Sequence, residues 1–270
     1  MAERIINHVA ETLRECPFIK GIVLGGSRAT GTATDTSDID IGIYYDPSDI
    51  DFDRLNEAAK QLDDDHRENL VCREGGWGNW VNCGGWLVTE GYQVDLILRD
   101  IGRVRACIAQ TDVGEVSAHY QTGHPHAYIN VMYRGELASG RLLYAPDQEI
   151  AGLKRRAETY PDSLRDALMS KFLFEARFSC ALARKNAYKG DLYYTVGHLF
   201  RGISALNQVL FAINRVYCLN EKKAIQRICS FGAAPADYGR RVSHVLSLAA
   251  DTEMEAVDEL ERLVEEVEQL

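Results

Sequence analysis

Two aspartates and a glycine turn form the first group of residues whose spacing could support chemistry. Asp38 and Asp40 are two positions apart, and they follow the turn residues Gly25, Gly26 and Ser27. On a strand, side chains two apart leave the same face, so both carboxylates are expected to point the same way. Glycine lets the backbone approach a ligand, and amides that begin a helix bind phosphate. Because Mg²⁺ binds one or two carboxylates together with substrate phosphates, the spacing predicts a magnesium–nucleotide site.

A third carboxylate, Asp95, lies in a later segment with strand periodicity. Apolar residues alternate with it through Val94, Leu96 and Leu98, which places Asp95 alone on the opposite face. The preceding segment, 86–89, also reads as a strand, and a turn at 90–91 joins the two into a hairpin. We expect this hairpin to lie beside the strand that carries the first two aspartates.

The order of these motifs resembles the nucleotidyltransferase signature of the DNA polymerase β-like superfamily: Gly-Ser, a short spacer, Asp-x-Asp, and a carboxylate on a later strand. The alternative is a set of surface acids on an ordinary α/β sheet. The resemblance implies a two-metal Mg²⁺ site held by Asp38, Asp40 and Asp95. It also implies that ATP or another nucleoside triphosphate is bound through Gly25, Gly26, Ser27, Arg28 and Ser37. For Arg28, a surface position on the short helix is an equal alternative.

The elements that would position this group form an α+β domain over residues 1–145, with a mixed sheet and flanking helices. Apolar stripes at helical spacing and short alternating runs mark its elements. Helices are expected at 3–16, 51–65, 101–109 and 129–138, and strands at 18–24, 39–45, 86–89, 92–98 and 140–144.

Residues 146–270 show helical patterns and no convincing strand, which predicts an all-α helical bundle domain. The clearest amphipathic run covers 191–220. An α+β domain followed by helices resembles the small antibiotic adenylyltransferases of the streptomycin/spectinomycin and lincosamide types. That resemblance implies transfer of AMP from ATP to a hydroxyl of a small acceptor, with release of pyrophosphate, and a role in antibiotic resistance. Asp95 is the expected general base, and Asp191 and Glu221 in the helical half are alternatives.

The net charge of the chain limits the classes of acceptor that we expect. The formal net charge is −10, which argues against a non-specific nucleic-acid binder and is compatible with a cationic small acceptor. Two other functions stay open. One is transfer of the nucleotide to a protein or an RNA end. The other is a regulatory, antitoxin-like member of the same fold, against which the long helical half and the three intact carboxylates argue.

The cysteines and the apolar runs bear on the compartment. The chain has seven scattered cysteines with no Cys-x-x-Cys pair, which predicts reduced thiols rather than a disulfide framework. No signal peptide is expected, and no run is judged long and apolar enough to span a membrane. We therefore expect a cytoplasmic protein with no membrane partner, either a monomer or a homodimer.

Two further segments have competing interpretations. The glycine-rich stretch 74–86 holds all three tryptophans, Trp77, Trp80 and Trp86. We favour a glycine-rich hairpin whose tryptophans cover the sheet over a pocket edge that binds a flat acceptor. The acidic run 63–65 ends a predicted helix, and we interpret it as a solvated terminus rather than a metal site.

Overall fold

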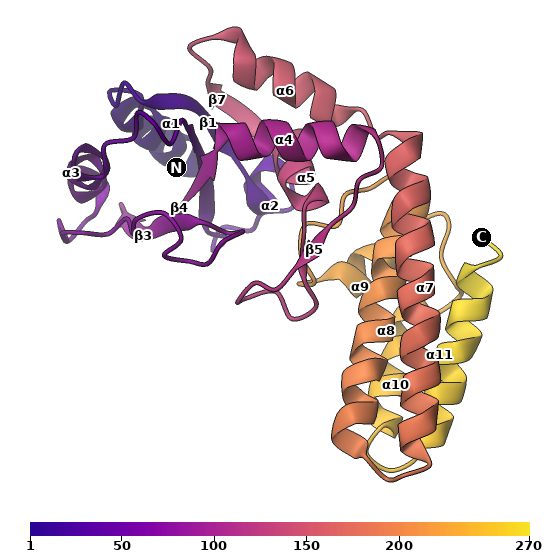
Figure 1. Cartoon of the computed structure of the whole chain (residues 1–270). Helices are drawn as coiled ribbons and strands as arrows, with labels where there is room; N and C mark the ends of the chain where they lie inside the picture. The colour runs from indigo at the N-terminus through magenta and orange to yellow at the C-terminus, as the bar shows by residue number, and fades with distance from the viewer. The chain divides into compact units, whose positions relative to one another are not determined.

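The computed structural model describes all 270 residues and contains two compact units (Figure 1). The first unit comprises 1–109, 119–123 and 133–159, and the second comprises 110–118, 124–132 and 160–270. The first holds a mixed sheet with helices, and the second is helical, which confirms the predicted fold class. A short two-stranded sheet of β5 (Ala118–His119) and β6 (Tyr128–Ile129) lies where the chain alternates between the units.

The sheet of the first unit has five strands in the order β3-β4-β2-β1-β7. Its strands are β1 (Ile19–Leu24), β2 (Ile39–Tyr45), β3 (Cys83–Thr89), β4 (Tyr92–Asp100) and β7 (Arg141–Tyr144). β2 and β4 are parallel, and the other neighbouring pairs are antiparallel. The hairpin β3–β4 turns at Glu90 and Gly91, both with positive φ, as a tight two-residue turn requires. The predicted hairpin and its place beside β2 are therefore confirmed.

One face of the sheet packs against the apolar sides of two amphipathic helices, and the other carries the carboxylates. The first unit's helices are α1 (Ala2–Leu13), α2 (Gly26–Ala29), α3 (Phe52–Leu62), α4 (Ile101–Asp112), α5 (Val131–Ser139) and α6 (Gln148–Glu158). Buried residues of α1 and α3 join Ile39, Ile41 and Leu96 in a single core cluster. Because side chains alternate along a strand, Asp40 and Asp95 lie on the opposite face from this cluster.

Helix α6 belongs to the first unit, although the sequence placed a boundary at residue 146. Ile150 of α6 packs on Gly21 of β1 so closely that a Cβ on that glycine would lie 3.0 Å from it. The apolar side of α6 is buried by this contact, so the helical pattern that begins at residue 148 does not mark the start of the second unit. The chain passes from the first unit to the second for the last time between Thr159 and Tyr160.

The acidic run after α3 is structural, and the interpretation of Asp63 as a solvated terminus is wrong. Asp63 is buried, and its carboxylate accepts hydrogen bonds from Arg67 at 2.6 and 2.9 Å and from the amide of Val88 at 3.0 Å. These bonds, led by the Arg67 guanidinium, hold the pKa of Asp63 well below its usual value despite its burial. Asp64 accepts the amides of the Glu90–Gly91 turn at 2.7 and 2.9 Å. The run therefore holds the β3–β4 hairpin in place.

Replacement of Asp63 is expected to lower stability in a pH-dependent way. The Asp63→Asn variant should lose about 2 kcal/mol at pH 7, because a charged acceptor of several hydrogen bonds is removed. The folded-state pKa is lowered, so this contribution is present above the ordinary carboxyl pKa of about 3.9 and is lost as the pH falls through the folded value. Urea unfolding at pH 7 and pH 3, with the exposed Asp65→Asn variant as control, measures the difference. Equal stability of Asp63→Asn and wild type at pH 7 would contradict this role.

The second unit is a bundle of helices that lie alongside one another in Figure 1. Its helices are α7 (Asp162–Ala187), α8 (Leu192–Ile213), α9 (Ala224–Ile228), α10 (Tyr238–Leu248) and α11 (Glu253–Val267). Arg184 of α7 pairs with Asp258 and Glu261 of α11 at 2.6 and 2.5 Å. These helices confirm the predicted bundle, although α8 ends at Ile213 rather than near residue 220.

Helix α8 is long and apolar enough to cross a membrane by length and composition alone, which differs from the expectation drawn from the sequence. However, 67% of the 18-residue apolar segment within α8 is buried inside the protein. A core helix of a bundle has this property, and α8 packs on α7, α10 and α11.

The seven cysteines are all free, and five of them are buried. No disulfide links segments of either unit in the structure.

Candidate functional site

The glycine turn between β1 and α2 lies against the carboxylate of Asp40. Gly25 donates its N–H to the carbonyl oxygen of Asp40 at 2.8 Å. Gly26 has a φ of +58°, and a Cβ on it would lie 1.8 Å from Asp40 Oδ2. A side chain at this position would need a left-handed backbone and would collide with the carboxylate, so glycine is required. The position of the turn and the position of the Asp40 carboxylate therefore depend on each other.

Backbone amides at the start of α2 can serve phosphate oxygens beside this carboxylate. α2 is a single turn of four residues, so its dipole is small. Its first N–H groups have no acceptor within the helix and include that of Ser27. The phosphate-binding capacity of the turn therefore comes from individual amide donors rather than from a long helix.

Asp95 is the direct neighbour of Asp40 on the adjacent parallel strand. Neighbouring strands lie about 4.8 Å apart, so the two half-buried carboxylates leave the same face from adjacent points. Asp38 precedes β2 and is exposed. Two of the three predicted carboxylates are therefore fixed on rigid strands, and the third stands at the entrance to β2.

Arg28 and Ser37 organise the loop that leads into β2. The Arg28 guanidinium donates to the carbonyl oxygens of Asp38 and Ser37 at 3.1 and 2.5 Å, and it lies 5.5 Å from the ring centre of Tyr92. Ser37 Oγ accepts the amide of Thr34 at 2.9 Å. Through these contacts Arg28 and Ser37 position Asp38, so both residues have a structural role. Their contact with phosphate stays a prediction.

The donor set suits a divalent cation that also binds phosphate. No three His, Cys, Asp or Glu side chains converge closely enough to hold a metal without further ligands. Mg²⁺ does not require such a cage, since it commonly takes one or two carboxylates and completes its shell with water and substrate phosphates. Asp40 and Asp95, with the glycine turn packed directly against Asp40, fit that requirement.

The helical-unit carboxylates considered as alternative bases are engaged in local structure. Asp191 caps α8, where its side chain accepts the amide of Tyr194 at 3.2 Å. Glu221 is largely buried and accepts the amide of His126 at 2.8 Å. Burial opposes ionisation of Glu221, but the His124 ring 3.4 Å away and the hydrogen bond from the His126 amide hold its pKa below the usual value. Both carboxylates therefore have structural partners within the helical unit.

The structure adds one feature that the sequence interpretation set aside. Trp86 of β3 lies directly opposite Asp95 of β4, and it is 59% exposed. Its ring stacks on that of Trp77, with centroids 4.6 Å apart. Trp80 instead stacks on His119 at 3.8 Å and has no part in this pair. Trp86 thus stands beside Asp95, whereas Trp77 lies over Gly84 of β3 and covers the sheet there, as predicted.

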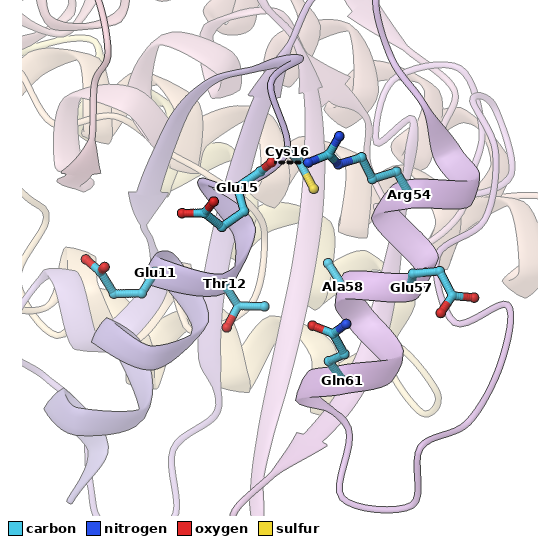
Figure 2. A pocket seen from close by; sticks show the side chains of 8 residues that line it. All are labelled: Glu11, Thr12, Glu15, Cys16, Arg54, Glu57, Ala58 and Gln61. Carbon is cyan, nitrogen blue, oxygen red and sulfur yellow. Dashed lines mark hydrogen bonds between the residues drawn. The ribbon is translucent and has the colours of Figure 1, made fainter.

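Two surface hollows are lined by residues other than the three carboxylates. Figure 2 shows the first, of about 460 Å³, between α1 and α3, where Arg54 donates to the carbonyl oxygen of Glu15 at 2.7 Å. These helices cover the sheet face opposite Asp40, so the hollow is not part of the site. The second, of about 630 Å³, lies along the first turns of α8 and is mostly apolar.

Comparison with known proteins finds a family match for the segment that carries the glycine turn and the first two aspartates. Residues 7–72 match the family model described as polymerase beta, nucleotidyltransferase, a range that includes the glycine turn, Asp38 and Asp40 but not Asp95. No curated protein matches the chain. A nucleotidyltransferase-like protein from Exiguobacterium sibiricum 255-15 is similar in structure, with 10% identity and a TM-score of 0.48 over 100% of this chain and 74% of that one. Over residues 7–72, which hold the turn that packs on Asp40, the chain is thus similar to polymerase β-like nucleotidyltransferases.

Proposed function

We propose that this protein is a magnesium-dependent nucleotidyltransferase that moves AMP from ATP to a hydroxyl of a small molecule. The observation that carries the proposal is the juxtaposition of the glycine turn, Asp40 and Asp95 on one face of the sheet. It is the arrangement that phosphate binding and metal binding require at the same place. An aminoglycoside-like or lincosamide-like acceptor is the class we favour.

The chain's own residues have separable tasks in this reaction. The Gly26 amide and Ser27 hold the β- and γ-phosphates. Asp38 and Asp40 would hold a divalent cation on the nucleotide phosphates, and Asp95 would complete a second cation position beside the acceptor hydroxyl. These cations would neutralise phosphate charge. Asp95 accepts the proton of the acceptor hydroxyl as its oxygen forms a bond to the α-phosphorus. The bond from that phosphorus to the bridging oxygen breaks, and pyrophosphate leaves.

The net charge and the site residues support a small acceptor over nucleic acid. A chain with a formal charge of −10 repels the phosphate backbone of RNA. Two half-buried carboxylates on one sheet face favour a substrate that brings its own positive charge. Transfer to a protein side chain is the outcome to which a negative small-molecule screen would point.

Pyrophosphate release tests the proposal. Wild-type protein with Mg²⁺ and ATP is assayed against a panel of aminoglycosides and lincosamides, and Asp38→Asn is the blank. We expect release with one acceptor class, dependent on Mg²⁺ and absent in the blank. Binding of Mg-ATP without release across the panel would remove these acceptors, and failure to bind Mg-ATP would overturn the proposed enzyme.

A further inference from the structure

Four residues form a row across the sheet, one from each of four neighbouring chain segments. Gly25, at the end of β1, bonds to Asp40 of β2, which neighbours Asp95 of β4, which in turn faces Trp86 of β3. Directly opposed residues share a face, so the three side chains in this row stand on one surface. With strands about 4.8 Å apart, Trp86 begins about 10 Å from Asp40, on the side away from the glycine turn.

The exposed indole of Trp86 is one half of a built aromatic pair. Gly84 lies two positions before Trp86 on β3, so both occupy the same face. A Cβ on Gly84 would lie 2.3 Å from the ring of Trp77, so the missing side chain makes the space in which that ring sits. Trp77 packs over Gly84 and stacks on Trp86, with an interplanar angle of 23°. We refer to Trp77 and Trp86 as the tryptophan pair.

The loop that carries Trp77 is held by buried polar side chains. Gln121 is buried, and its amide bonds to the carbonyl of Trp77 at 2.6 Å and to the amide of Trp80 at 3.0 Å. At the other end of the loop, Asn82 donates to the hydroxyl of Tyr45 at 2.8 Å. Such contacts fix the backbone of the loop, and this keeps the tryptophan pair in one place before any ligand arrives.

The side from which the acceptor must approach the phosphate is the side on which the tryptophan pair lies. In an in-line displacement the attacking group approaches the α-phosphorus on the side opposite the leaving pyrophosphate. The glycine turn would hold that pyrophosphate at the β1 side of Asp40, so the attacking hydroxyl comes from the side of β4 and β3. Trp86 is the first large exposed side chain on that side, directly beside Asp95.

We infer that the tryptophan pair is the acceptor-binding platform, and that it takes a hydroxylated ring bearing positive charge, such as an amino sugar. The inference rests on the proposed function, since it assumes that Asp40 and Asp95 mark the reacting phosphate. An indole face attracts both the C–H face of a ring and a nearby cation. The Asp95 carboxylate opposite Trp86 adds negative charge to this position. A cationic ring compound therefore meets an aromatic surface and a carboxylate at once.

Calorimetric titration of two variants tests the platform. Kanamycin A and streptomycin are the cationic probes and sucrose is the neutral one, each titrated with Mg²⁺ and a non-hydrolysable ATP analogue present. Trp86→Ala should weaken binding of a cationic probe about tenfold, and Trp86→Phe less, because a smaller aromatic face remains. Tyr120→Ala removes a 94% exposed aromatic side chain outside the row and should change nothing.

Titration with the Mg–nucleotide alone separates the possible failures. We expect Trp86→Ala to bind it as wild type does. Equal loss of nucleotide and probe binding would place the nucleobase on Trp86 and overturn the platform. Probe binding that is the same in wild type and Trp86→Ala, including none in either, would also overturn it. Binding of a probe at Trp86 without pyrophosphate release would instead sustain the platform and count against the proposed transfer.

Discussion

Asp40→Asn should abolish nucleotidyl transfer while leaving the fold intact. The side chain begins at the centre of the row, in contact with Gly26 and next to Asp95. The amide keeps the shape of the carboxylate but removes the charge that a divalent cation needs, so we expect kcat/KM to fall at least about a thousandfold, or about 4 kcal/mol. The side chain is only half-buried, so the unfolding midpoint should move little.

Steady-state pyrophosphate release and thermal unfolding are measured together to check this. Asp35→Asn is the matched control, because that aspartate is exposed in the loop before β2. Asp38→Asn should also abolish transfer, since Asp38 stands at the entrance to the same strand. Activity of Asp40→Asn within about twofold of wild type, a change too small for loss of a metal ligand, would remove the proposed metal site.

Asp95→Asn should reduce turnover far more than nucleotide affinity. Asp95 lies on the opposite side of Asp40 from the glycine turn, where the acceptor hydroxyl would lose its proton. Loss of a general base typically costs about 10²- to 10⁴-fold in rate, so we expect a kcat at least about a hundredfold lower. The dissociation constant of Mg-ATP should change by less than about threefold, because the contacts to the β- and γ-phosphates are retained.

Single-turnover rates and calorimetric binding of Mg-ATP separate these two effects for Asp95→Asn. Asp40→Asn serves as the comparison, since it should lose both. If Asp95→Asn loses rate and affinity in equal measure, Asp95 is a binding ligand only, and the base must be sought elsewhere.

Local sequence patterns are sufficient to predict the strands that carry the site. The alternation of Asp95 with buried neighbours predicts β4, and Glu90-Gly91 predicts the turn that joins it to β3. The same turn fixes the register, because counting outward from a two-residue turn pairs Trp86 with Asp95. The sequence alone therefore predicts that Trp86 lies beside Asp95.

Contacts between distant segments were not available from local patterns. The approach of Gly26 to Asp40 depends on how the loop after α2 returns to the sheet, and Arg28 sets that return through carbonyl groups. Gln121 reaches a loop far away in sequence, and the burial of Asp63 depends on Arg67 and on β3. Periodicity reports which face of an element is apolar, and it does not report which distant backbone a polar side chain will meet.

The position of β3 at the edge of the sheet has a consequence for how the protein can diversify. Asp40 and Asp95 lie on inner strands, each paired on both sides, whereas Trp86 lies on a strand paired on one side only apart from a single bridge. With the acceptor platform that we propose on Trp86, substitutions on β3 and in its flanking loop would alter which compound is recognised without disturbing the ladder that aligns the carboxylates. The choice of substrate and the phosphoryl chemistry can then evolve separately within one small sheet.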